Sequence, residues 1–224
     1  MEQSRNSPSK RLHFGANRRH PRSGSHGQAY TDARTIQPPS FAFSSLMSNS
    51  VVLVDANDRP LGTADKLEAH AEGWLHRAFS IFVFDAHDRL LLQQRHAGKY
   101  HSGGLWSNTC CSHPYPGESL TDATQRRLVE EMGFTCTLDR KFGFTYRASV
   151  GGDLTEHEYD HVFVGRTLTT PDVMPHPDEV SDWRWVDPHA LRDDVAARPE
   201  RYTVWFRLVL DRTLDAALSA RPAA

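Results

Sequence analysis

The segment SHPYPGESLTDATQRRLVEEMGF, residues 112–134, predicts a turn followed by a helix. Its Pro-Tyr-Pro-Gly run favours the turn, and an acid then opens the helix. Ser119 or Thr121 can cap this helix, because a side-chain hydroxyl accepts a hydrogen bond from a free backbone N–H of the first turn. Gly133 favours the left-handed backbone that ends a helix. We therefore expect a helix over residues 119–132.

The segment just before this helix, residues 107–114, brings a thiol close to an imidazole. Cys111 lies two positions before His113, and such a pair can form a metal site, a reactive thiol or a tight buried loop. Together with Cys110 and Cys136 it makes no disulfide framework, since two of the three cysteines are adjacent. We therefore expect a reducing, cytoplasmic compartment.

Apolar, β-rich runs on both sides of these segments predict a sheet. Residues 78–84 and 89–95 are apolar on both faces and predict a central hairpin that is covered on both sides. Further elements are expected as strands at 51–54, 142–147, 154–166 and 183–186, as helices from 188 and over 200–218, and as a short helix or loop at 66–70. Because strands and helices interleave without repeated βαβ units, the sequence predicts an α/β (α+β) fold with a mixed sheet flanked by helices.

Composition and charge exclude several classes of function. An apolar fraction of 38%, a mean hydropathy of -0.58 and a formal net charge of -2 predict a soluble protein that binds neither nucleic acid nor an acidic membrane surface. The longest apolar runs, residues 79–84 and 204–210, are too short to span a bilayer. The length fits one domain with a tail, as a monomer or a homodimer.

Residues 1–45 differ from the rest of the chain. They are rich in Ser, Arg, Gly and His and contain only two acids, Glu2 and Asp32. Such a segment cannot bury enough apolar surface to offset its ordering entropy, so we expect a disordered basic tail before a domain at residues 46–220. Met47 is an alternative start, and a targeting role is an alternative interpretation of the tail.

Three carboxylates follow one another along the predicted strand at residues 154–166. Because side chains alternate along a strand, Glu156, Glu158 and Asp160 share one face and repel one another unless a cation or solvent relieves them. They form either a solvated edge strand or a metal site. The strand continues into the apolar residues 162–164, and a charged face that enters the core favours the metal site.

Two histidines, His70 and His76, precede the predicted central hairpin. Each taken alone is an ordinary surface or hydrogen-bonded histidine. With His113 they offer three nitrogens, and Glu156 and Glu158 extend these to a five-ligand set that suits Zn, Mn or Fe. The spacing in sequence does not establish that these segments converge.

Four basic residues are dispersed along the chain and, taken singly, are solvated surface charges. Gathered at the mouth of one pocket they would suit a diphosphate, because Arg makes two parallel contacts and Lys supplies a point charge. The four are Lys66, Arg95, Lys99 and Arg127.

The quoted segment resembles the Nudix box, G-x5-E-x7-R-E-U-x-E-E-x-G-U, a loop–helix–loop whose acidic helix binds a divalent metal over a diphosphate. Two positions depart from the box: Ser112 replaces the first Gly, and Arg127 replaces the Glu that follows the Arg. The second change removes an acid and argues against pyrophosphate hydrolysis, while Glu131 remains a candidate Mg ligand. The helix charges could otherwise form only a solvated, internally paired face.

The chain resembles type I isopentenyl-diphosphate Δ-isomerase over roughly residues 50–210. The resemblance rests on several motifs together: LHRAFS at 75–80, LQQR at 92–95, SNTCCSHP at 107–114, FTYR at 144–147 and EHE at 156–158. It implies a Nudix-like α/β/α fold and the interconversion of isopentenyl and dimethylallyl diphosphates, with a small isoprenoid diphosphate as the substrate.

The resemblance also implies roles for individual residues. The ligands of a transition metal, Mn or Zn, would be His70, His76, His113, Glu156 and Glu158. Mg would be bound by Glu131, the substrate diphosphate and the backbone carbonyl of Cys111. The acid–base pair would be Cys111 and Glu158, with Tyr146 assisting Glu158. The diphosphate would be held by Lys66, Arg95, Lys99 and Arg127.

The chemistry of this reaction fits these roles. Protonation of an unactivated alkene forms a carbocation-like centre, so a strong acid is needed on one side and a base on the other. Water must be excluded, since it would trap the cation. Trp205 could turn its ring face to that charge or be an ordinary core residue. The alternatives are a Nudix diphosphate hydrolase and a catalytically silent, metal-stabilised binding protein.

Overall fold

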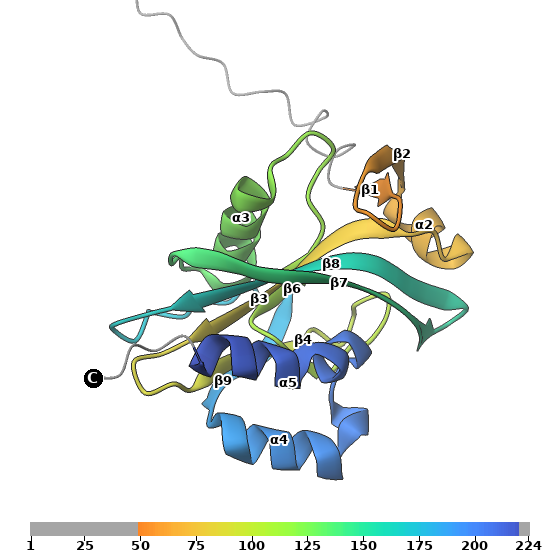
Figure 1. Cartoon of the computed structure of the whole chain (residues 1–224). Helices are drawn as coiled ribbons and strands as arrows, with labels where there is room; N and C mark the ends of the chain where they lie inside the picture. The colour runs from red at the N-terminus through yellow and green to blue at the C-terminus, as the bar shows by residue number, and fades with distance from the viewer. Residues whose placement is uncertain (1–48, 220–224) are drawn as a thin grey trace, which may run out of the picture. The chain divides into compact units, whose positions relative to one another are not determined.

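The computed structural model of the chain describes residues 49–219 (Figure 1). The expected tail at residues 1–45 and the alternative start at Met47 lie outside this range. The elements in chain order are β1 (Ser50–Val54), β2 (Pro60–Asp65), α2 (Lys66–Glu72), β3 (His76–Phe84), β4 (Leu90–Arg95), β5 (Trp106–Ser107), β6 (Cys110–Ser112), α3 (Leu120–Met132), β7 (Leu138–Gly151), β8 (Leu154–Arg166), β9 (Val180–Val186), α4 (Pro188–Ala197) and α5 (Val204–Leu218).

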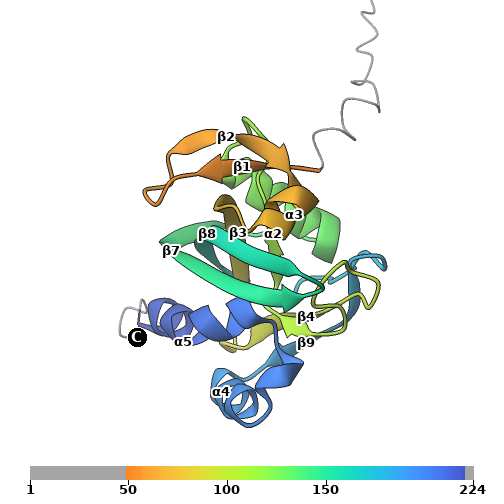
Figure 2. The same ribbon diagram turned by 90° about the vertical axis from the view of Figure 1, so that its right-hand side faces the viewer.

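Strand β3 lies at the centre of the sheet and is buried along almost its whole length. It pairs in parallel with β8, beginning with His76 opposite Glu158, and it pairs antiparallel with β6, where Ser80 lies opposite Cys111. β7 pairs antiparallel with β8, and the two form a long ribbon (Figure 2). The sheet is therefore mixed, as the sequence predicts.

The predicted hairpin of β3 and β4 forms only at its turn. The two strands pair through Phe84 and Leu90 and then diverge, β3 toward β6 and β8, and β4 toward β5 and β9. Thr109 bridges them where they part: its Oγ1 accepts a 2.9 Å hydrogen bond from the N–H of Val83 and donates a 2.7 Å one to the carbonyl of Leu91. The expectation of a regular hairpin is therefore wrong beyond the turn.

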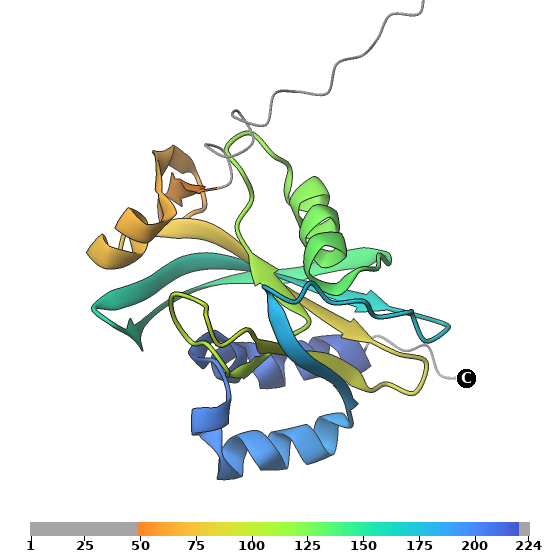
Figure 3. The same cartoon turned by 180° about the vertical axis from the view of Figure 1, so that it is seen from behind.

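Helices cover both faces of the sheet (Figures 1 and 3). On one face, Leu128 of α3 packs in a core with Phe79 and Ile81 of β3. On the other, Phe206 of α5 packs in a core with Phe82 of the same strand. Successive side chains of a strand point to opposite faces, so one central strand contributes to both cores. This arrangement confirms the predicted mixed sheet flanked by helices.

Helix α3 has the capping residues that the sequence predicts. Oγ of Ser119 accepts a 3.1 Å hydrogen bond from the N–H of Asp122 in the first turn. Gly133 follows the last turn with a φ of 77°, and a Cβ at this position would lie 2.5 Å from the carbonyl oxygen of Met174. Backbone conformation and close packing therefore both favour glycine here.

Other boundaries differ from the expectations. The last helix begins at Val204 rather than at residue 200, because Pro199–Arg201 forms a separate 3₁₀ turn and the backbone is extended at Tyr202. β2, β5 and β6 were not expected, and the last two are only two and three residues long, too short for a periodic signal. None of the helices within residues 49–219 is long and apolar enough to cross a membrane.

Candidate active site and metal centre

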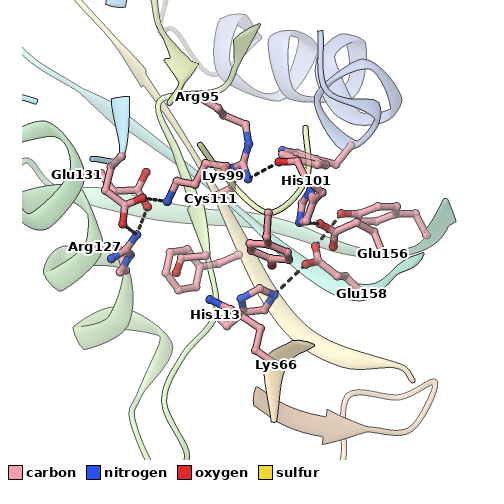
Figure 4. A pocket seen from close by; sticks show the side chains of 16 residues that line it. Lys66, Arg95, Lys99, His101, Cys111, His113, Arg127, Glu131, Glu156 and Glu158 are labelled. Atoms are coloured by element: carbon pink, nitrogen blue, oxygen red, sulfur yellow. Dashed lines mark hydrogen bonds and ion pairs between the residues drawn. The ribbon is translucent and has the colours of Figure 1, made fainter. Parts of the chain in front are cut away.

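One pocket collects the side chains on which the predicted chemistry depends (Figure 4). Every predicted catalytic or substrate-binding residue lines it, while the predicted ligands His70 and His76 are fully buried and face its carboxylates. The lining residues are Lys66, Phe79, Arg95, Lys99, Tyr100, His101, Cys111, Ser112, His113, Arg127, Glu131, Tyr146, Glu156, Glu158, Glu179 and Trp205.

Strand register brings the imidazoles and carboxylates together. His76 opens β3 opposite Glu158 of β8, and its Nε2 lies 3.6 Å from Oε1 of that carboxylate. His113, which follows β6, places its Nε2 2.9 Å from the same oxygen. His70 of α2 places its Nε2 3.5 Å from Oε2 of Glu156. The five residues predicted as ligands therefore converge, which their spacing in sequence did not establish.

The two fully buried histidines have fixed tautomers. Nδ1 of His70 lies 2.6 Å from the carbonyl oxygen of Lys66, and Nδ1 of His76 lies 2.8 Å from that of Trp74. Because a carbonyl oxygen only accepts, each Nδ1 carries a proton, and in the neutral form of either ring Nε2 presents a lone pair. Both imidazoles are thus prepared to bind a cation through Nε2.

The donor set fits a divalent metal ion. Candidate ligand atoms lie within 4.8 Å of one another in two groups, one formed by His70, His76, His113 and Glu158 and the other by His70, His101 and Glu156. Nε2 of His76 and Oε2 of Glu156 are buried and have no hydrogen-bond partner among residues 49–219. Buried polar atoms without partners are costly, and a metal ion would satisfy both.

Glu158 is held at both of its oxygens. Oε1 faces His113, and Oε2 accepts a 2.7 Å hydrogen bond from the hydroxyl of Tyr146 on β7. Burial alone would raise the pKa of Glu158, but the nearby imidazoles of His113 and His76 hold it well below its usual range. Burial lowers the pKa of His113 to about 4, so this imidazole is neutral at pH 7 and available as a ligand.

The third carboxylate of the acidic strand has a different environment. β8 pairs on both sides, with β3 and β7, so the alternative of a solvated edge strand is wrong. Asp160 is buried and accepts a 2.8 Å hydrogen bond from the hydroxyl of Ser80. Burial and the charge of Glu158 raise the pKa of Asp160 well above its usual range.

The two adjacent cysteines differ in their surroundings. Cys110 is fully buried in the core beneath α3, whereas Cys111 lines the pocket, with its Sγ 3.9 Å from Nη1 of Arg95. Neighbouring residues of β6 point to opposite faces, which explains the difference. Burial raises the pKa of Cys111 to about 12 despite the opposing charge of Arg95, so its side chain is a neutral thiol at pH 7.

Cations and carboxylates alternate at one side of the pocket. Arg127 pairs with Glu131 and also lies 3.4 Å from Glu179, which in turn pairs with Lys99. Burial, followed by the charges of Lys99 and Arg127, lowers the pKa of Lys66. Lys66, Lys99 and Arg127 line one pocket and could therefore contact a single polyanion.

Trp205 forms a fixed wall of the pocket. Its side chain is almost completely buried, and its Nε1 donates a 3.1 Å hydrogen bond to Oγ of Ser107. The guanidinium of Arg95 lies 5.2 Å from the centre of the indole ring. The ring therefore faces the pocket as well as the core, and its π face favours a positive charge beside it.

Comparisons with known proteins agree with this architecture. The family model described as the NUDIX domain matches residues 74–206. A solved structure from Deinococcus radiodurans has a TM-score of 0.59 at 16% sequence identity and covers 73% of this chain and 98% of that one. A MutT protein of Methanosarcina mazei has a TM-score of 0.53 at 19% identity and covers 66% of this chain and 96% of that one. These likenesses establish the fold.

Relatives with much higher sequence identity carry one name. Isopentenyl-diphosphate Delta-isomerase 2 of Aromatoleum aromaticum is 55% identical over 169 residues, which cover 75% of this chain and 88% of that protein. Isopentenyl-diphosphate Delta-isomerase of Burkholderia multivorans is 54% identical over 166 residues, 74% of this chain and 93% of that protein. The chain belongs to the isopentenyl-diphosphate Delta-isomerase family.

Membership of the isomerase family confirms the predicted fold and the predicted class of enzyme. The Nudix fold and the cluster of imidazoles and carboxylates also indicate that this isomerase binds a divalent metal. Arg127, which stands where the Nudix box has Glu, pairs with Glu130 and Glu131 on α3. That position therefore brings a cation instead of an acid to the isomerase pocket.

Five lining residues of the isomerase pocket were not predicted as site residues: Phe79, Tyr100, His101, Ser112 and Glu179. His101 lies 3.0 Å from Glu156, the hydroxyl of Tyr100 lies 3.4 Å from Nε2 of His70, and Glu179 pairs with Lys99. Tyr100 and His101 directly follow Lys99, a predicted substrate-binding residue, and this proximity was the available signal. Glu179 stands in a polar segment before β9, and no pattern in the sequence connects it with the pocket.

Proposed function

We propose that this chain interconverts isopentenyl diphosphate and dimethylallyl diphosphate, in isoprenoid biosynthesis, by moving protons onto and off the carbon skeleton. The observation that carries the proposal is the presence of Cys111 and Glu158 in one pocket lined by cations. Glu158 projects from β8 between Tyr146 and the imidazoles, whereas Cys111 projects from β6. Acid–base groups thus reach the pocket from two different strands, as a transfer of protons at two carbons requires.

The diphosphate anchors the substrate in this proposal. Its ligands would be the four cations Lys66, Arg95, Lys99 and Arg127, and the anion would replace Glu179 as the partner of two of them. Glu131, which accepts a 3.0 Å hydrogen bond from Gln93, would bind Mg together with the diphosphate and the backbone carbonyl of Cys111. Binding energy from the diphosphate then positions the alkene between the acid–base groups.

A second divalent metal, Mn or Zn, would be held by His70, His76, His113, Glu156 and Glu158. When bound, it would withdraw charge from the carboxylate of Glu158 and fix its orientation. Three imidazoles and two carboxylates are a donor set that suits such a metal better than Mg.

The chain's own residues transfer the protons. One proton is added to the terminal methylene carbon of the double bond, and the adjoining carbon becomes a tertiary cation-like centre. A different proton then leaves the methylene on the other side of that centre, and the double bond re-forms there. Cys111, a neutral thiol, serves one carbon, and Glu158 with Tyr146 serves the other. The direction of the reaction decides which group donates and which accepts.

Two aromatic residues protect the cation-like centre. Trp205 and Tyr146 line the pocket and are both more than nine-tenths buried, so they exclude water that would trap the intermediate. The indole face also attracts positive charge, and in the ligand-free pocket the guanidinium of Arg95 lies near that face.

One assay tests the proposed function. Purified protein incubated with isopentenyl diphosphate and Mg should form the dimethylallyl isomer and release no phosphate. Release of phosphate would instead support a Nudix diphosphate hydrolase, and the absence of both products would support a silent binding protein. Cys111→Ala serves as the negative control and Cys110→Ala, in the opposite face of the same strand, as its matched positive control.

The same proposal includes a reducing, cytoplasmic location, which the free thiols of Cys110, Cys111 and Cys136 support. All of the proposed site residues come from one chain, so a monomer and a homodimer would both contain complete sites.

A further inference from the structure

His101 lies on the loop between β4 and β5, in the pocket and beside Glu156 (Figure 4). We propose that His101 is a positioning residue, which holds Glu156 in the orientation in which that carboxylate binds the metal, and that it is not a ligand itself. The inference rests on the metal centre proposed above and concerns a residue outside its five ligands.

The two oxygens of Glu156 have different surroundings. Oε1 lies 3.0 Å from Nε2 of His101. Oε2 lies 3.5 Å from Nε2 of His70 and has no hydrogen-bond partner within the described part of the chain. The carboxylate is therefore anchored through one oxygen and presents the other to the remaining ligands. An imidazole this close to one oxygen restricts the orientation of the carboxylate and leaves the other oxygen for a metal.

The proposal places a proton on Nε2 of His101. An ionised carboxylate offers only lone pairs, so a nitrogen 3.0 Å from its oxygen is best matched when that nitrogen carries a proton. Nδ1 of the same ring lies 3.2 Å from Oγ of Ser102 and can accept the proton of that hydroxyl. A nitrogen that carries a proton toward Glu156 has no lone pair for a metal, so in this proposal His101 acts on the centre through the carboxylate.

The grouping of the candidate ligand atoms agrees with this arrangement. Those of His76, His113 and Glu158 lie within 4.8 Å of one another and of His70. His101 reaches the same mutual distance only in a group with His70 and Glu156. His101 and Glu156 therefore form one group with His70, and His76 and His113 form another with His70 and Glu158.

Several contacts fix the position of His101. Nη2 of Arg95 donates a 3.3 Å hydrogen bond to its backbone carbonyl, and its ring meets the ring of Trp205 edge-on, with 5.9 Å between the centroids. The side chain is 3% exposed, against 5% for Glu156. A residue held this firmly can fix the orientation of a ligand, because its own rotamer is locked by packing.

The test compares His101→Leu and His101→Gln with the unaltered protein. Leu removes the donor, whereas Gln keeps an N–H near the place of Nε2. The matched control is His96→Leu, which removes another imidazole from the same loop but does not line the pocket. The affinity for Zn²⁺ is measured by competition with a chelator, and the number of imidazole ligands is measured by X-ray absorption of the zinc-loaded protein.

His101→Leu should lower the affinity for Zn²⁺ about 10- to 100-fold, the usual effect of removing a partner that orients a ligand. His101→Gln should recover most of this loss, and His96→Leu should bind like the unaltered protein. The zinc should have three imidazole ligands in every case. Unchanged affinity in His101→Leu, or four imidazoles in the unaltered protein and three in that variant, would overturn the proposal.

Two further measurements separate this inference from others. Thermal unfolding with the chelator present should give nearly equal midpoints for His101→Gln and the unaltered protein, so that a loss of affinity is not a loss of folding. An unaltered protein that binds no Zn²⁺ would overturn the metal centre and the role of His101 together. A zinc-binding protein that shows the expected variant effects but forms no dimethylallyl diphosphate would overturn the proposed reaction alone.

Discussion

Tyr146 and Glu158 lie opposite each other on β7 and β8, and the tyrosine hydroxyl donates a 2.7 Å hydrogen bond to Oε2 of the carboxylate. Burial and the charges of Glu156 and Glu158 raise the pKa of Tyr146 well above its usual range, so this hydroxyl keeps its proton at neutral pH. The tyrosine is therefore a permanent donor to the carboxylate that faces the imidazoles through its other oxygen.

Tyr146→Phe removes this donor and leaves the ring in place. A hydrogen bond to a charged group contributes about 1.5–3 kcal/mol, which corresponds to a roughly 10- to 150-fold loss of kcat. Turnover of isopentenyl diphosphate measures the effect. Phe144→Leu, which alters the aromatic ring stacked on Tyr146 at 5.5 Å, controls for packing. A Tyr146→Phe enzyme with the original kcat would remove the hydroxyl from the mechanism.

Substitutions of the two adjacent cysteines should have opposite effects. Cys111→Ala removes a proposed acid–base group from the pocket and should lower kcat by at least about 100-fold, within the range for loss of general acid–base catalysis. Cys110→Ala alters only the core beneath α3, so it should cost a little stability and leave kcat within a few fold. Activity assays and urea unfolding of both variants give the answer. An inactive Cys110→Ala beside an active Cys111→Ala would show that the other thiol is catalytic.

The metal-free protein should lose stability in mild acid. The pKa of His113 is about 4 in the folded chain, below its ordinary value of 6.5, so between these values the unfolded chain binds a proton that the folded chain does not. The neutral His113 ring therefore makes its full contribution to the free energy of unfolding above pH 6.5, and this contribution is lost as the pH falls toward 4. A pKa difference of this size corresponds to a loss on the order of 3 kcal/mol.

Urea unfolding in the presence of a chelator, above and within this pH window, measures the loss. His113→Gln should flatten the dependence across the window. Glu158, whose pKa is also depressed, adds a loss in the same direction at lower pH. If His113→Gln keeps the full pH dependence, another group is responsible for it.

Glu179→Gln should strengthen the binding of inorganic diphosphate. This carboxylate pairs with Lys99 and lies 3.4 Å from Arg127, so an incoming anion must replace it. Removing its charge should lower the Kd of diphosphate several fold and lower the stability of the ligand-free protein, because two cations lose a partner. Calorimetric titration measures the first effect and thermal unfolding the second. Weaker binding by the variant would mean that Glu179 holds Lys99 in place for the anion.

Sequence patterns predicted those parts of the fold that depend only on residues close together in the chain. The helix after Ser119 and its end at Gly133 follow from capping and backbone conformation, which neighbouring residues fix. The divergence of β3 and β4 does not, because the hydroxyl of Thr109 enters from a segment that is distant in sequence and satisfies both backbones. Strand pairing is a property of the assembled sheet, so the expected hairpin was wrong beyond its turn.

In the site, too, local sequence patterns indicated the candidate residues, but only the assembled sheet brings them together. Its residues could be named from motifs, but their convergence depends on the parallel register of β3 and β8, which sets His76 opposite Glu158. No motif contains this register. His101 and Glu179 were missed because each acquires its role only from a partner on another element, Glu156 in one case and Lys99 in the other.

Lys99, Tyr100 and His101 are consecutive in the chain, yet they contact three different parts of the pocket: Glu179 among the proposed anion-binding cations, the ring of His70 and the carboxylate of Glu156. A ligand that shifts Lys99 must therefore act on the same short loop that supports the metal centre. If bound diphosphate changes the affinity for metal by some factor, bound metal must change the affinity for diphosphate by the same factor, because coupling between two binding sites is reciprocal. A dissociation constant for either ligand would then have meaning only at a stated concentration of the other.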